Sequence, residues 1–374
     1  MHIAVVHDWL IAKGGAENVL QALTEIYPNA PVYTLVYDAR GPCGEFLADR
    51  QVVTSFLQRF PQSTLRYRSF LPLMPLAIEQ FDLSPYEIVI SSSHAVAKGI
   101  LTHPDQLHVC YCYTPIRYAW DLQHQYLRQS GLEHGAKGWL AKGILHYIRL
   151  WDTRTSNGVD AFIAISRFIA QRIRKIYRRE AKVIYPPVDV ERFAPCAEKQ
   201  EYYFTAGRMV PYKRVDLIVK AFAHMPHRKL VVIGDGPEYA KIQADVPPNV
   251  TLLGYQPWEV LHEKMRQAKA FIFAAEEDFG ILPVEAQACG TPVIAYGKGG
   301  ALETVIEGKT GLFFKEQTVE SIIEAIEQFE NSPTDFSMDE LVANAKRFAK
   351  ERFKTEIENF INQQWQKFKR EKTL

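Results

Sequence analysis

Short apolar runs rich in Val, Ile, Phe and Tyr alternate with helix-like patterns along the whole chain. The runs are continuous rather than alternately polar and apolar, which is typical of parallel strands covered by helices on both faces. Strands are predicted at residues 2–7, 31–37, 87–93, 107–113 and 161–166, and again at 201–207, 229–234, 250–255, 270–275, 291–296 and 310–314. This pattern predicts an α/β fold built from two doubly wound parallel-sheet domains.

A proline-rich stretch divides the chain, which at 374 residues is long for one core. Adjacent prolines in "VIYPPVDVERFAP" (183–195) cannot continue a helix and indicate an extended linker. We therefore expect domains at 1–183 and 184–355. The last stretch has the apolar spacing of an amphipathic helix, and its residues from about 356 to 374 could pack back on the first domain.

The composition of the chain indicates which kinds of binding partner and which cellular location to expect. With 47% hydrophobic residues, 23% charged residues and a net charge of +1, the chain has no global field for nucleic acid, so we expect no nucleic-acid partner. The start lacks a signal-peptide pattern and no apolar run is long enough to span a membrane, which predicts a cytoplasmic protein with at most peripheral membrane contact. The five cysteines show no ligand spacing, so we expect reduced thiols and no metal.

Polar residues follow the predicted strands of the first half, where ligands of open α/β sheets bind. Gly14 and Gly15 precede a predicted helix, but they lack the G-x-G-x-x-G spacing of a dinucleotide site. His94 in "SSSHAVAKGI" falls at the carboxyl end of the third predicted strand. The loop "CYCYTPIRYAWD" offers a mixture that suits carbohydrate or, equally, a polar loop at an interface: Tyr113, Arg117, Trp120 and Asp121.

The second half combines cations, a helix start and two acids. Arg208 and Lys213 in "GRMVPYKR" lie between a predicted strand and a helix near residue 215, where phosphate binds readily. In "EEDFGILPVEAQACG", Glu277 and Glu285 flank the backbone amides of 280–282, and Pro283 places Glu285 in the first turn of a helix. Acids on either side of a phosphate site suggest hydroxyl anchors for a nucleotide-sugar. Alternatively, Glu285 only complements the helix dipole and 276–278 is a solvated loop.

Together these motifs resemble the retaining glycosyltransferases of family 4. The resemblance covers essentially the whole chain through "GGAE", "GRMVPYKR", "GDGP", "EDFGILPVEA" and "GKGGALETVIEGKTGLFF". It implies the GT-B fold, with two Rossmann-like domains facing a central cleft. "HDWL…GGAE", "SSSHAVAKG" and "YTPIRYAWD" look most like bacterial mannosyltransferases of cell-surface polysaccharide assembly.

The resemblance implies an acceptor-binding first domain, a donor-binding second domain and specific roles. Arg208 and Lys213 would bind the donor diphosphate, Glu277 the transferred sugar and Glu285 the ribose, while His94 would lie near the reacting sugar. His94, Arg208, Lys213 and Glu277 form the catalytic set. Further donor-binding residues are Gly15, Gly207, Gly234, Gly254, Tyr255, Phe279, Gly280, Ile281 and Leu282. Acceptor-binding residues are Asp8, Gly14, Gly15, Tyr113, Arg117, Trp120 and Asp121. Transfer would proceed with retention, and neither a metal nor another cofactor is expected.

Donor and acceptor identity stay open at the sequence level. GDP-mannose is the preferred donor; a UDP-sugar transferase, a nucleotide-sugar 2-epimerase and a non-catalytic nucleotide-sugar-binding protein are the alternatives. Basic apolar segments at 56–81 and 138–151 suggest a glycan or lipid-linked acceptor met at the inner face of the plasma membrane. Core helices with solvated arginines explain the same segments equally well.

Overall fold

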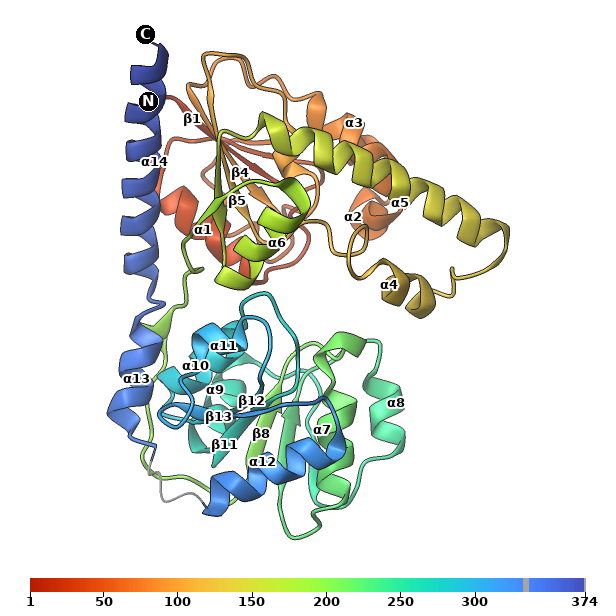
Figure 1. Cartoon of the computed structure of the whole chain (residues 1–374), viewed down its shortest axis with the longest axis vertical. Helices are drawn as coiled ribbons and strands as arrows, with labels where there is room; N and C mark the ends of the chain where they lie inside the picture. Colours follow the sequence, from red (N-terminus) through yellow and green to blue (C-terminus); the bar gives the residue numbers. More distant parts are fainter. Residues whose placement is uncertain (332–335, 373–374) are drawn as a thin grey trace. The chain divides into compact units, whose positions relative to one another are not determined.

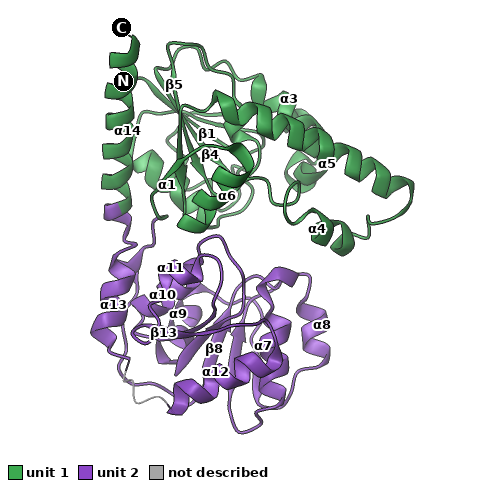
Figure 2. Ribbon diagram, in the orientation of Figure 1, with its two compact units in different colours: residues 1–186, 353–374 green, residues 187–352 purple. Residues whose placement is uncertain are grey.

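The computed structural model describes residues 1–331 and 336–372 and divides them into two compact units (Figures 1 and 2). Unit 1 comprises Met1–Pro186 and the C-terminal segment from Phe353, and unit 2 comprises Pro187–Arg352. The division falls between the two adjacent prolines, a few residues after the expected boundary at 183. The first residues of the C-terminal helix belong to unit 2 and its body to unit 1.

Unit 1 is built on a seven-stranded parallel sheet in the order β3-β2-β1-β4-β5-β6-β7. Its strands are β1 Ile3–His7, β2 Val32–Thr34, β3 Val52–Thr54, β4 Ile88–Ser93, β5 Leu107–Cys112, β6 Ala161–Ala164 and β7 Ala181–Val183. Every residue of β1, β4 and β5 is buried, as continuous apolar strands covered on both faces require.

Helices cover both faces of this sheet. They are α1 Gly15–Ile26, α2 Ser63–Arg66, α3 Met74–Glu79, α4 Gln123–Gln129, α5 Gly135–Thr155, α6 Arg167–Tyr177 and α14 Lys350–Lys372. Short 3₁₀ turns occur at Phe56–Arg59, Tyr67–Leu73, Ala97–Gly99 and Ser156–Gly158. One core joins β1, β2 and β4 to α3 and to Trp151 of α5. A smaller core lies between α4 and α5 and includes Leu127 and Leu145.

The C-terminal helix α14 packs on unit 1 through a stripe four residues apart: Phe353, Ile357, Ile361 and Trp365 are all buried. The ring of Phe353 meets that of Tyr111 on β5 edge-on, with centroids 5.7 Å apart. Lys354 pairs with Glu25 of α1 at 2.8 Å. The spacing of four follows from the helical period, which brings every such residue to one face.

Unit 2 has a six-stranded parallel sheet in the order β10-β9-β8-β11-β12-β13. Its strands are β8 Tyr203–Ala206, β9 Leu230–Ile233, β10 Val250–Leu252, β11 Ala270–Phe273, β12 Val293–Tyr296 and β13 Gly311–Phe314. Its helices are α7 Val215–Ala223, α8 Tyr239–Ala244, α9 Trp258–Gln267, α10 Ile281–Ala288, α11 Ala301–Thr304, α12 Val319–Asn331 and α13 Met338–Lys346, with 3₁₀ turns at Val190–Arg192 and Pro211–Lys213. Residues of α7 and α12 share one core with the sheet.

All eleven predicted strands are confirmed, and two further strands were missed. The missed strands, β3 and β7, have three residues each and lie at the two edges of the unit 1 sheet. Their residues are only partly buried or exposed, so they lack the long apolar run that marks a central strand. None of the described helices combines the length and the apolar composition that crossing a bilayer requires.

Strand order locates the ligand-binding edge in each unit. The direction of winding reverses between β1 and β4 in unit 1 and between β8 and β11 in unit 2. Ligands of open α/β sheets bind at such switch points, outside the carboxyl ends of the strands. We therefore expect ligand-binding and catalytic residues in the loops that follow β1, β4, β8 and β11.

Candidate functional site

Asp8 lies directly after β1, at the unit 1 switch point, and its carboxylate accepts four hydrogen bonds from the backbone. One oxygen accepts the backbone N–H groups of His94 and Ala95 at 2.7 and 3.0 Å, and the other accepts those of Val96 and Ala97 at 2.6 and 2.7 Å. Its side chain is fully buried. Four N–H groups occupy the acceptor capacity of a carboxylate. Asp8 therefore fixes the turn after β4, and both of its oxygens are already occupied by protein groups.

That turn presents His94, whose side chain keeps 26% of its surface exposed. The Nδ1 atom lies 3.1 Å from Asp8 Oδ2, and the edge of Trp9 packs on the ring at a centroid distance of 4.5 Å. Burial lowers the pKa of His94, and the negative charge of Asp8 opposes this only in part. The imidazole is therefore neutral near pH 7 and can accept or donate one hydrogen bond at its exposed edge.

Gly14 and Gly15 form the start of α1, where Gly14 is the N-cap and Gly15 the first helical residue. The Gly14 N–H donates to Glu17 Oε2 at 2.8 Å, which is the half of a capping box that a glycine N-cap can form. Glu17 in turn lies 3.6 Å from His7 Nε2. Glu17 and His7 were not among the predicted site residues, although the quoted motifs "HDWL" and "GGAE" contain both.

The residues predicted to bind the acceptor from the loop after β5 are engaged by the protein. The Tyr113 hydroxyl donates to the Ala16 carbonyl at 2.9 Å and contacts Ser92 Oγ at 2.8 Å, and its side chain is buried. Both hydrogen-bond partners of this hydroxyl lie within unit 1. Its role is to tie β5 and β4 to the start of α1.

Farther along the same loop, Trp120 donates its indole N–H to Asp152 at 2.7 Å. Asp152 is fully buried and also pairs with Lys98 at 2.5 Å. Asp121 is exposed and forms an ion pair with Arg172 of α6. Arg117 lies half-buried in this loop. Trp120 and Asp121 thus anchor the loop to the body of unit 1, and their contact with an acceptor stays a prediction.

In unit 2 the structure brings Lys213 and Glu277 together at the switch point, as an ion pair with side chains 17% and 16% exposed. Lys213 ends the 3₁₀ turn that follows β8, and Glu277 lies in the loop between β11 and α10. Arg208, in the same turn region as Lys213, is exposed. One predicted cation and one predicted acid therefore meet directly, and the second cation lies open to solvent.

Three predicted glycines bring the turns after β8, β9 and β10 into contact. Gly207, Gly234 and Gly254 all have positive φ angles, of 140°, 143° and 68°. A Cβ atom on Gly234 would lie 1.9 Å from the carbonyl oxygen of Gly207, and the Gly234 N–H donates to Gly254 at 2.8 Å. Only glycine permits this approach. The neighbouring side chain of Tyr255 is 81% exposed.

The segment "GKGG" (297–300) packs against the backbone of the Glu277 loop. It is part of a motif noted in the sequence, where it had no predicted role. The Gly300 N–H donates to the Glu277 carbonyl at 2.8 Å. A Cβ atom on Gly300 would lie 2.3 Å from Phe279 Cα, and one on Gly299 would lie 2.4 Å from the Glu277 carbonyl oxygen. Phe279 is buried and packs edge-on against Phe348, so its side chain belongs to the core rather than to a donor site.

Helix α10 begins after Gly280, its N-cap, whose φ of 84° requires glycine. Ile281 and Leu282 are half-buried at its first positions, and Pro283 lies in the first turn. Glu285 is the fifth helical residue, just beyond the first turn in which it was predicted, because the helix already begins at Ile281. Burial raises the pKa of Glu285 to about 7, against the opposing charge of Arg192.

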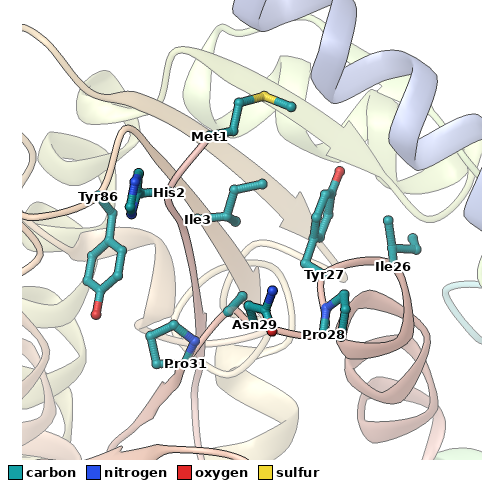
Figure 3. A pocket seen from close by; sticks show the side chains of 10 residues that line it. Met1, His2, Ile3, Ile26, Tyr27, Pro28, Asn29, Pro31 and Tyr86 are labelled. Carbon is teal, nitrogen blue, oxygen red and sulfur yellow. The ribbon is translucent and has the colours of Figure 1, made fainter.

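A cavity of about 340 Å³ opens at the other end of the unit 1 sheet, by the amino end of β1 (Figure 3). Figure 3 shows Tyr27 and Tyr86 on either side of the segment Met1–Ile3. The residues that line this cavity include none of the predicted site residues. Among the described residues, no group of three or more His, Cys, Asp or Glu side chains is placed to hold a metal ion.

Two family models match the chain in succession and together span most of it. Residues 13–192 match the model described as Glycosyltransferase Family 4, and residues 189–352 match Glycosyl transferases group 1. The chain belongs to glycosyltransferase family 4. The two matches meet at the division between the units, so each model corresponds to one Rossmann-like sheet of a GT-B glycosyltransferase.

Curated relatives are similar over part of their length. An uncharacterized glycosyltransferase of Methanocaldococcus jannaschii is 30% identical over 228 residues, which cover 58% of this chain and 62% of the relative. A GDP-mannose-dependent alpha-(1-6)-phosphatidylinositol monomannoside mannosyltransferase of Mycolicibacterium smegmatis is 29% identical over 204 residues, covering 46% of this chain and 53% of the relative. The chain thus spans between half and two thirds of these relatives.

Solved structures share the fold over nearly the whole chain. Sucrose-phosphate synthase from Thermosynechococcus elongatus superposes with a TM-score of 0.71 at 17% identity, covering 98% of this chain and 99% of that one. HepE of Anabaena, in complex with UDP and glucose, superposes with a TM-score of 0.69 at 17% identity, covering 97% and 99%. At this identity the likeness establishes the fold.

Proposed function

We propose that this chain is a retaining glycosyltransferase that transfers mannose from GDP-mannose to a glycan or lipid-linked acceptor. The observation that carries the proposal is the Lys213–Glu277 pair at the unit 2 switch point, beside the start of α10. A cation, an acid and free helix amides in one place match the phosphate and hydroxyl groups of a nucleotide-sugar. The names of several relatives at about 30% identity favour GDP-mannose over a UDP-sugar.

Donor chemistry follows from this arrangement. Departure of a nucleoside diphosphate builds negative charge on the phosphate, and Lys213, Arg208 and the amides at the start of α10 would stabilise it without a metal. Phosphate binding would draw Lys213 from Glu277, which frees the Glu277 carboxylate to accept hydroxyls of the transferred sugar. Glu285, farther along α10, would hold the ribose. In unit 1, His94 and the Gly15 turn would serve the reacting sugar and the acceptor.

Lys213→Ala and Glu277→Ala test the donor site directly. We expect each variant to lower transfer from GDP-mannose by two or more orders of magnitude, as loss of a charged transition-state contact does. Lys220→Ala is the matched control, because Lys220 lies exposed on α7 and pairs only loosely with Asp216 at 3.9 Å. Near wild-type transfer in both site variants would refute the assignment. Running the same assay with UDP-sugars, and without acceptor, tests the alternative donors and epimerisation.

For the acceptor, both segments that the sequence left open expose large apolar side chains. Segment 56–81 buries Leu57, Met74 and Ile78 in the unit 1 core, and its exposed apolar residues are Phe60, Leu65, Leu73 and Leu76. Helix α5 exposes Trp139, Leu140, Tyr147 and Leu150, by 77%, 67%, 46% and 61%. Figure 1 shows the amino-terminal half of α5 reaching beyond the sheet, next to α4.

Charge favours an anionic membrane surface as the partner of this α5 stripe. Lys137, Lys142 and Arg154 flank it, and the one acidic residue of α5, Asp152, is fully buried. Exposed aromatic and aliphatic side chains with flanking cations suit the lipid interface. We expect the chain to sediment with vesicles containing phosphatidylglycerol and Trp139→Ser/Leu140→Ser/Leu150→Ser to stay in solution, with Leu101→Ser as the exposed control. Failure of the wild-type chain to bind would favour a soluble acceptor.

A further inference from the structure

Hydrogen bonds join the start of α1 to the carboxyl ends of β1, β4 and β5. His7 Nδ1 lies 3.0 Å from Ser92 Oγ, Ser92 Oγ lies 2.8 Å from the Tyr113 hydroxyl, and that hydroxyl donates to the Ala16 carbonyl at 2.9 Å. His7, Ser92 and Tyr113 are all buried. Since these groups are buried, each of them needs a partner, and the direction of each hydrogen bond follows from the partners named.

Those directions can be worked out from the carbonyl end. The Ala16 carbonyl only accepts, so the Tyr113 hydroxyl gives it its single proton. The Tyr113 oxygen must then accept from Ser92, which uses the proton of the serine hydroxyl. The Ser92 oxygen in turn accepts from His7. The Nδ1 atom of His7 therefore carries a proton.

The other ring nitrogen, His7 Nε2, faces a carboxylate. It lies 3.6 Å from Glu17 Oε1, is buried, and has no hydrogen-bond partner among the described residues. Glu17 Oε2 is already accepting the Gly14 N–H at 2.8 Å. A neutral imidazole protonated on Nδ1 would turn a lone pair toward this carboxylate. Two buried acceptors facing each other are unfavourable unless one proton lies between them.

We propose that His7 and Glu17 form a buried imidazolium–carboxylate pair whose proton holds the Gly14–Gly15 turn in place. The pair acts as a positioning device: His7 orients Glu17, and Glu17 holds the backbone at the start of α1. Glu17 supports this assignment. Burial would raise its pKa, but the pKa of Glu17 is lowered overall, with the hydrogen bond and charge of His7 as the largest lowering causes, followed by a backbone hydrogen bond and His94.

The surroundings of His7 are compatible with a positive charge on its ring. His94 faces it with ring centroids 6.1 Å apart, and burial lowers the pKa of His94, so this neighbour is neutral. The carboxylate of Asp8, the next residue along the chain, accepts backbone N–H groups of the turn after β4. Thr34 is the register partner of His7 on β2, and the Tyr113 hydroxyl, directly after β5, contacts the Ser92 hydroxyl to which His7 bonds. Among the described residues, Glu17 on α1 is the charged group paired with the ring.

The consequence rests on the proposed function, in which the Gly14–Gly15 turn serves the transfer site. Loss of the shared proton at high pH would set the Nε2 lone pair against the carboxylate. Glu17 would move away and release the Gly14 N–H, and the turn would loosen. We therefore expect kcat/KM of the wild-type chain to fall on the alkaline side by about tenfold for each pH unit, as loss of one proton requires.

Nitrogen-15 NMR of the histidine-labelled full chain tests the proton without any activity assay. With the His7 signals assigned through His7→Gln, both ring nitrogens should be protonated at pH 7. A His7 ring with one protonated nitrogen would overturn the inference. Because this measurement needs neither donor nor acceptor, it can fail while the proposed transfer stands, or hold while the proposed transfer fails.

Glu17→Gln tests the positioning role. The amide oxygen can still accept the Gly14 N–H, and the amide NH₂ can donate to a neutral His7 Nε2, so the contacts close without the proton. We expect His7 to become singly protonated and the alkaline fall of kcat/KM to shrink to less than about twofold per pH unit. Glu25→Gln, on the same helix but paired with Lys354, should keep the wild-type profile. An unchanged alkaline limb in Glu17→Gln would overturn the positioning role.

Discussion

Asp8→Asn is the most direct test of how unit 1 presents His94. The wild-type carboxylate accepts four backbone N–H groups at 2.6 to 3.0 Å in a fully buried place. Asparagine keeps one oxygen, which can serve two of these groups, but its NH₂ then faces the other two donors. Each buried N–H left without an acceptor costs about 1–3 kcal/mol, so we expect roughly 2–6 kcal/mol of local destabilisation.

Hydrogen exchange, measured by mass spectrometry on peptides that contain residues 94–97, reports the local destabilisation of this turn. A local measurement is needed because a chain of two units need not unfold in one cooperative transition. A loss of about 2 kcal/mol would speed exchange of these amides roughly 30-fold. Asp38→Asn is the matched control, since Asp38 accepts one backbone N–H, from Arg40 at 3.1 Å, and should change exchange little. Wild-type protection of 94–97 in Asp8→Asn would refute the claim that this carboxylate holds the turn.

Two further outcomes concern unit 2. Gly300→Ala would push a Cβ atom into Phe279 and displace the Glu277 loop, so we expect a loss of roughly 1–3 kcal/mol in stability and weaker GDP binding by calorimetry; Gly143→Ala, with open space around it, should leave GDP binding unchanged. For Glu285, the folded-state pKa of about 7 lies above the ordinary 4.5, so its burial is fully tolerated below pH 4.5 and destabilises unit 2 as the pH rises through 7. Glu285→Gln should remove this pH dependence of the thermal midpoint, and a midpoint that still falls between pH 5 and 8 would contradict the assignment.

The sheets were predictable because central parallel strands carry their own signal. A strand such as β4 is buried on both faces, so its apolar run is visible in the sequence. The three-residue edge strands β3 and β7 depend on pairing with a neighbour, and that information lies elsewhere in the chain. The Lys213–Glu277 pair was foreseeable for a related reason, since both residues follow strands that meet at the switch point.

The unit 1 residues show where such reasoning stops. Asp8, Tyr113 and Trp120 also follow strand ends, and each was assigned to an acceptor. Their partners, however, are backbone amides, a carbonyl and the buried Asp152. Position in the sequence fixes which edge of the sheet a side chain reaches, but not whether the protein has already used its hydrogen-bonding capacity.

The hydrogen-bonding capacity that a carboxylate has left therefore distinguishes Asp8 from Glu277 better than their positions in the sequence do. Asp8 has all four N–H contacts that a carboxylate can take, and giving one to a ligand would strand a buried amide. Glu277 instead forms an ion pair with Lys213, and in the proposed function phosphate replaces the carboxylate as a partner of that lysine. A carboxylate whose partner can be exchanged in this way is suited to take a substrate hydroxyl, and on that physical ground Glu277, rather than Asp8, is the acid we assign to the sugar.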